Sequence, residues 1–173
     1  MSSTNHFFAL FGLPVQFEID MDVLQSNYRK IQSEVHPDKF VTASPAERLQ
    51  SMQTATLANE AYQTLKHPTS RARYLLQLQG VETLEDSNTA MPADFLMTQM
   101  EWREAMEEAQ HAKNITALEH LLTTMKSEAK LMQSEVSHLI QSNPAQAAQL
   151  VRKLSFIDKV SADVHQLISR LED

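Results

Sequence analysis

A histidine and an aspartate flank a proline in the tripeptide His36-Pro37-Asp38. Histidine titrates near neutral pH and aspartate is an anion there, so the pair has the residue types of a general base and the carboxylate that orients it. No convincing nucleophile or cluster of polar pocket residues is written nearby. A hydrolase that uses His36 and Asp38 is one alternative, and a turn that only breaks the helix is another. The residues around the tripeptide argue against a chance occurrence.

The tripeptide is predicted to separate two long helices. Proline fixes its own φ and pushes the preceding residue out of the α region, so a helix running up to Val35 is expected to stop at His36. Before this break, apolar side chains recur at steps of four, three and four, the spacing of one helix face, at Leu24, Tyr28, Ile31 and Val35. The residues just before the loop therefore form an amphipathic helix.

A capping box, Ser44-Pro45-Ala46-Glu47, opens the second helix, which runs to about Lys66. Two antiparallel helices with the His-Pro-Asp loop at their tip follow. We expect seven apolar side chains of the second helix to enter a small core: Leu49, Met52, Ala55, Ala58, Ala61, Tyr62 and Leu65.

Shorter elements are predicted around this hairpin from their caps. Asn5 is expected to cap a short first helix that ends at Gly12, and Asp20 to cap the helix before the loop. A further short helix over residues 71–79 is expected to stop at Gly80.

Composition limits the class of protein. Residues 1–173 are 42% apolar and contain two glycines, which predicts an all-α soluble protein with a sizeable core. The chain has no cysteine, no signal-like segment and no apolar run long enough to cross a bilayer, so the cytoplasm is the expected compartment. Residues 1–80 hold seven Lys/Arg and seven Asp/Glu, whereas residues 81–173 hold eight and fifteen. That acidic bias is opposite to the one expected of a nucleic-acid binder.

The second half of the chain predicts a separate three-helix bundle. Residues 1–80 form the first domain, residues 81–91 lose the apolar period and are predicted to be a linker, and residues 92–173 form the bundle. Its helices are expected over 92–112, after a capping box at Thr116 to Glu119, and after Asn143-Pro144. Coiled-coil-like spacing on the last two helices predicts that they pack antiparallel.

The first bundle helix has two distinct faces at about 100° per residue. Phe95, Trp102, Met106 and Ala109 share one direction and are predicted to enter the bundle. The opposite side, with Leu96 at its edge, carries Met97, Met100, Glu101, Glu104 and Glu108. This side is either a solvated acidic face with incidental methionines or an adaptable binding surface whose carboxylates steer a basic partner. Phe156 lies off the seam of the last helix and is a candidate extension of that surface.

Several motifs around the tripeptide together resemble a J-domain over residues 5–76. They are Tyr28-Arg29-Lys30, Lys39, Asn59 to Leu65, His67-Pro68 and Arg71-Ala72-Arg73-Tyr74. The resemblance implies docking on a DnaK/HscA-type chaperone, which holds the nucleotide and whose ATP hydrolysis the loop stimulates. The implied chaperone-binding residues are Tyr28, Arg29, Lys30, His36, Pro37, Asp38 and Lys39.

Nearly the whole chain is similar to the HscB family. The residues that carry this likeness are Arg71 to Leu76, His36 to Phe40, Phe95-Leu96-Met97 and Val151 to Lys159. The resemblance implies a co-chaperone, not an enzyme, that delivers the iron–sulfur scaffold protein IscU to the chaperone HscA, with another client as the alternative. The implied scaffold-binding residues are Leu96, Met97, Met100, Glu101, Glu104, Glu108 and Phe156.

No cofactor or metal is expected. The chain has no cysteine for the zinc module that some HscB family members carry, which indicates the bacterial type. Its seven histidines include no pair at i, i+3 or i+4, so a local helical metal site has no support.

Overall fold

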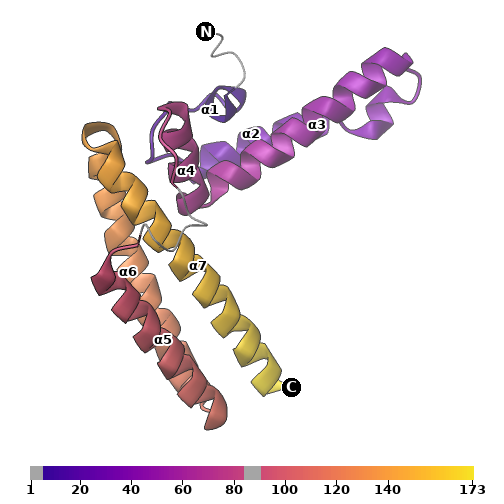
Figure 1. The fold of residues 1–173 in the computed structure, drawn as a ribbon. Coiled ribbons are helices and arrows are strands. Elements are labelled where there is room, and N and C mark those ends of the chain that lie inside the picture. The colour runs from indigo at the N-terminus through magenta and orange to yellow at the C-terminus, as the bar shows by residue number, and fades with distance from the viewer. Residues whose placement is uncertain (1–5, 84–90) are drawn as a thin grey trace. The chain divides into compact units, whose positions relative to one another are not determined.

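The computed structural model describes residues 6–83 and 91–173, and the regular elements in these ranges are helices. The chain divides into two compact units, Met1–Leu75 and Leu76–Asp173, with the division inside helix α4. Figure 1 shows the elements of each unit. The all-α fold predicted from the sequence is confirmed.

The first unit is a helical hairpin with a short helix beside it. It contains α1 (Phe7–Leu10), α2 (Met21–Glu34), the 3-10 helix η2 (Pro37–Phe40), α3 (Pro45–Lys66) and most of α4 (Pro68–Leu78). Helices α2 and α3 run antiparallel, and η2 lies in the turn that joins them (Figure 1). The predicted hairpin is therefore confirmed, with the tripeptide at its tip.

The predicted caps of the hairpin helices are confirmed. Asp20 accepts hydrogen bonds from the backbone N–H groups of Asp22 and Val23 at the start of α2. Ser44 and Glu47 form the reciprocal capping box of α3, with Pro45 at the first helical position. Each cap satisfies N–H groups that have no partner within the helix.

Helix α1 differs from the prediction at its start. Its N-cap is His6, whose Nδ1 accepts from the N–H of Ala9 at 3.1 Å. The predicted cap, Asn5, lies outside the described residues. At the other end Gly12 has φ +63°, and Leu13 donates to the carbonyl of Phe8, so Gly12 ends the helix as expected.

Leu49 and Met52 were predicted in the core, and both predictions are wrong. Their side chains are 57% and 66% exposed, whereas Ala58, Ala61 and Leu65 are buried. Three successive steps of three residues turn the helix about 900°, so Leu49 points roughly 180° away from Ala58. An apolar pattern of repeated threes spirals around the helix and leaves the core face.

The second unit is a three-helix bundle. It contains α5 (Ala93–His111), α6 (Ile115–Ser142) and α7 (Pro144–Glu172). Helices α6 and α7 form a long antiparallel hairpin, and α5 packs against both (Figure 1). Asn143 caps α7 and Pro144 is its first residue, as predicted.

The cap of α6 is Asn114, which corrects the prediction of a capping box at Thr116. The Asn114 side chain accepts from the N–H of Ala117 at 3.0 Å, so Thr116 already lies within the first turn. Just before it, Lys113 has φ 50°, and Asn114 donates to the carbonyl of Ala109. The preceding helix thus ends in a left-handed turn that places Asn114 where it caps the next one.

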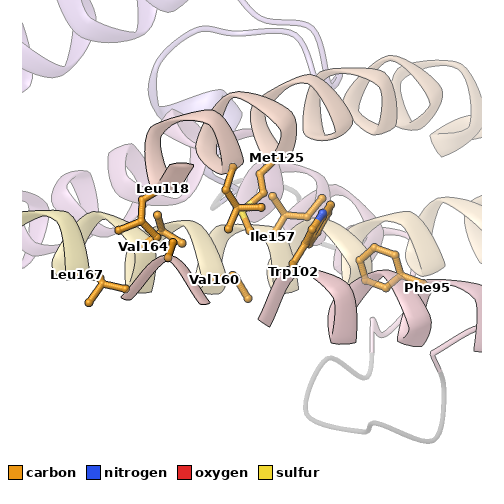
Figure 2. Close-up of a cluster of buried hydrophobic side chains, with 10 residues drawn as sticks. Phe95, Trp102, Leu118, Met125, Ile157, Val160, Val164 and Leu167 are labelled. Carbon is orange, nitrogen blue, oxygen red and sulfur yellow. The ribbon is translucent and has the colours of Figure 1, made fainter. Parts of the chain in front are cut away.

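The core of the bundle is a cluster of apolar side chains from all three helices (Figure 2). Phe95, Trp102 and Ala109 of α5 are buried in it, and Met106 packs against it half-buried, which confirms the predicted inward face. The partners from the other two helices are Leu118, Leu121, Met125, Ile157, Val160, Val164 and Leu167.

Residues 79–83 belong to the second unit and contact its helices. Gly80 has φ +78° and Val81 donates to the carbonyl of Leu76, so Gly80 terminates α4 as predicted, with Leu78 as the last helical residue. The helix begins at Pro68, three residues before the predicted start, because proline is tolerated in the first turn. Gln79 Nε2 donates to the carbonyl of Ile140 at 3.0 Å, and Arg152 Nη1 donates to the carbonyl of Thr83 at 2.9 Å. Most of the predicted linker, residues 84–90, lies outside the described residues, and its role stays a prediction.

Candidate functional site

The His-Pro-Asp loop places its two titratable side chains in solvent. His36 is the N-cap of η2, and the N–H of Asp38 donates to its Nδ1 at 3.2 Å. The same Nδ1 lies 3.6 Å from Oδ2 of Asp38, and the two side chains are 58% and 89% exposed. The tripeptide therefore forms a short, locally bonded turn whose functional groups face outward.

The predicted basic residues lie on the surface of the same unit. Arg29 and Lys30 are exposed on α2, and Lys39 is exposed in η2. Lys30 precedes His36 by six residues, or roughly 9 Å along a helix. The positive charges therefore lie within about two helical turns of the loop.

Tyr28 points inward, unlike Arg29 and Lys30, which follow it. Its ring stacks on Tyr62 with centroids 4.1 Å apart and planes 3° apart, and its hydroxyl donates to the Asn59 side chain. This contact joins α2 to α3. Tyr28 therefore contributes to the site by holding the hairpin that presents the loop.

Arg71 and Tyr74 belong to a motif that resembles a J-domain, and both make contacts within the first unit. Arg71 is buried, donates from Nη1 to the carbonyl of Leu65 at 2.8 Å, and lies 5.0 Å from the ring centroid of Phe17. Burial lowers the pKa of its guanidinium, and the charge of Glu18 opposes that shift. Tyr74 stacks on the ring of Phe7 and accepts from the N–H of the same residue.

The outward side of α5 carries a mixed apolar and acidic surface, here called the α5 patch. Leu96, Met97 and Met100 are 37%, 65% and 71% exposed. The carboxylates beside them are also exposed. The patch consists of Leu96, Met97, Met100, Glu101, Glu104 and Glu108. The two faces predicted for this helix are therefore present.

Phe156 of α7 lies beside α5 but is half-buried. Its ring meets the ring of Phe95 edge to face, with centroids 5.8 Å apart. The guanidinium of Arg103 lies over Phe156, and the ammonium of Lys153 lies over Phe95, each 5.5 Å from the ring centroid. Sequence reasoning missed both cations, although Arg103 follows Leu96 at i+7 and so lies on the same side of α5.

A groove of about 420 Å³ lies elsewhere, between α6 and α7. Among the described residues, no three or more His, Asp or Glu side chains are grouped so as to hold a metal ion. None of the helices in the described ranges combines the length and apolar character needed to cross a bilayer.

Comparison with known proteins gives consistent matches. Residues 91–165 match the family described as "HSCB C-terminal oligomerisation domain". The chain is 48% identical to "Co-chaperone protein HscB homolog" of Paraburkholderia phymatum over 167 residues, which cover 96% of this chain and 95% of that relative. Among solved structures, HscB from Vibrio cholerae has a TM-score of 0.85 and 41% identity, covering 96% of this chain and 99% of that one. Human co-chaperone HscB has a TM-score of 0.88 and 29% identity, covering 96% and 83%.

A helical hairpin with an outward His-Pro-Asp turn, followed by a helical bundle, defines a J-domain type of co-chaperone. The relatives that match over nearly the whole chain are named as such. The chain belongs to the HscB co-chaperone family.

Proposed function

We propose that this co-chaperone docks on a DnaK/HscA-type chaperone in the cytoplasm and stimulates ATP hydrolysis by that chaperone. The observation that carries the proposal is the exposure of His36 and Asp38 at the tip of the hairpin. A side chain can contact a partner protein only if it is exposed, and both of these side chains are exposed. The contact set is Tyr28, Arg29, Lys30, His36, Pro37, Asp38 and Lys39, with Tyr28 acting through the hairpin.

The second half of the proposal concerns the client. The α5 patch and Phe156 bind an iron–sulfur scaffold of the IscU type, which the co-chaperone then delivers to the chaperone. Exposed methionines suit an adaptable binding surface, and clustered exposed apolar side chains mark interaction sites. In this proposal, residues 1–80 contact the chaperone, residues 81–91 connect the two domains, and residues 92–173 bind the scaffold.

The test is single-turnover ATP hydrolysis by purified chaperone with the full-length chain. His36→Gln is expected to abolish stimulation while leaving the far-UV circular dichroism spectrum unchanged, because the side chain is exposed. His67→Gln is a matched control, since His67 also precedes a proline and is exposed at the other end of α3. It is expected to stimulate like the unaltered chain.

Two outcomes would contradict the proposal. Full stimulation by the His36→Gln variant would remove the loop mechanism, and ATP hydrolysis by this chain alone would favour the hydrolase. A separate binding measurement with the scaffold and with an unrelated protein addresses the client. Equal binding of both proteins would favour the alternative, a co-chaperone for another client.

A further inference from the structure

A second set of charges lies beside the α5 patch, on the side that faces α7. The guanidinium of Arg103 and the ammonium of Lys153 are each 5.5 Å from the ring centroid that they cover, Phe156 and Phe95 respectively. Both distances are within the range of a cation–π contact. Because the two rings meet edge to face, the four side chains form one continuous row across α5 and α7.

Arg103 lies on the other flank of the α5 patch from the carboxylates. At about 100° per residue, it is rotated roughly 100° from Glu104 and roughly 140° from Glu108 around the helix. Leu96 lies within roughly 20° of Arg103 and Met100 within roughly 60°. Leu96 and Met100 therefore lie between Arg103 and the acidic flank, and Met97 lies among the carboxylates.

The cationic flank does not extend along the whole patch. Glu107 follows Arg103 at i+4 and is exposed on the same side, so that the flank turns acidic one turn later. Lys153 lies over Phe95, one residue before Leu96. Lys153 therefore lies near the Leu96 end of the patch, whereas Arg103, seven residues after Leu96 and five before Glu108, lies near its middle.

Both cations are positioned by aromatic rings. Arg103 is exposed and Lys153 is half-buried. Within residues 6–83 and 91–173 neither is joined to a carboxylate, and each lies over a ring. An aromatic face orients a cation but carries no net charge, so these ring contacts do not cancel the charge that each side chain offers to a partner.

We propose that Arg103 and Lys153 determine specificity by binding a carboxylate of the protein that docks on the α5 patch. Together with Glu101, Glu104 and Glu108 they fix the direction in which that protein lies. The inference rests on the proposed function, in which the docked protein is the iron–sulfur scaffold. The matching surface is an apolar ridge with basic side chains on one side and an acidic one on the other. A partner turned end for end would face like charges on both flanks.

The test measures the association rate of the full-length chain with purified scaffold at two ionic strengths. Arg103→Gln with Lys153→Gln is expected to slow association about three- to tenfold at low ionic strength, with the difference fading at high salt. Arg103→Lys with Lys153→Arg keeps both charges and is expected to associate at the unaltered rate. Lys126→Gln with Lys130→Gln removes the same net charge from exposed positions of α6 and is expected to have little effect.

Unaltered association by the Arg103→Gln, Lys153→Gln variant would overturn this inference and leave the proposed function intact. A loss of affinity equal at both ionic strengths, together with a lower unfolding midpoint, would also overturn it, because it would assign the cations to packing of α5 on α7. If the unaltered chain does not bind the scaffold at all, the proposed function itself fails.

Discussion

Tyr28 of α2 and Tyr62 of α3 stack with ring centroids 4.1 Å apart and planes 3° apart. The pair joins the two helices of the hairpin. The side-chain oxygen of Asn59 also accepts a hydrogen bond from the hydroxyl of Tyr28. The hairpin that presents the His-Pro-Asp loop is therefore joined by a contact made away from the loop itself.

Breaking this stack is expected to destabilise the hairpin. Tyr28→Ala is expected to lower the free energy of unfolding by about 1–3 kcal/mol, because half-buried ring area and an aromatic pair are lost. Tyr28→Phe keeps the stack, loses only the hydroxyl contact, and is expected to cost about 1 kcal/mol or less. Urea unfolding followed by circular dichroism checks both values. Equal stability of Tyr28→Ala and the unaltered chain would show that the stack does not hold the hairpin.

The exposed apolar residues of α3 are expected to contribute little to stability. Leu49→Ala and Met52→Ala each shorten a side chain that is exposed to solvent. Each is expected to change the free energy of unfolding by no more than about 0.5 kcal/mol. Leu65→Ala, at a fully buried position of the same helix, is expected to cost about 2–5 kcal/mol. Comparable losses at all three positions would contradict the exposed placement of Leu49 and Met52.

The left-handed turn between α5 and α6 offers a stabilising substitution. Lys113 has φ 50°, a conformation that glycine adopts at lower cost than any residue with a Cβ atom. Lys113→Gly is expected to raise the thermal unfolding midpoint, with a gain of about 0.5–1 kcal/mol. The control is Lys130→Gly at an exposed position inside α6, which is expected to cost about 1 kcal/mol. A lower unfolding midpoint for Lys113→Gly would show that the positive φ of Lys113 does not strain the turn.

The apolar and acidic parts of the α5 patch are expected to act differently on scaffold binding. Leu96→Ala with Met100→Ala is expected to speed dissociation at any salt concentration, at a cost of about 1–3 kcal/mol in affinity. Replacing Glu101, Glu104 and Glu108 with glutamine is expected to slow association, most strongly at low ionic strength. Titration calorimetry at two salt concentrations measures the affinities, and stopped-flow mixing measures the rates. Unchanged affinity in the apolar double variant would show that this surface is a solvated face that does not bind the scaffold.

Local signals in the sequence determined where most helices begin and end. The Ser44 capping box, the Asp20 cap, Asn143-Pro144 and the two glycines were all interpreted correctly. Each of these signals acts within one turn of the chain, because a cap or a left-handed residue satisfies backbone groups only a few positions away. The inward face of α5 was also predictable, since Trp102 and Phe95 recur at helical spacing.

Only the tertiary structure decided which apolar and aromatic side chains meet a neighbouring helix. Leu49 lies on the solvent side of α3, Tyr28 stacks inward on Tyr62, and Phe156 is held half-buried between Phe95 and Arg103. Helical periodicity tells which residues share a face, but the rotation of each helix and the partner that covers it depend on packing between residues far apart in the chain. For that reason the loop could be found from the sequence, whereas the contact of Lys153 on α7 with the ring of Phe95 on α5 could be found only from the packed bundle.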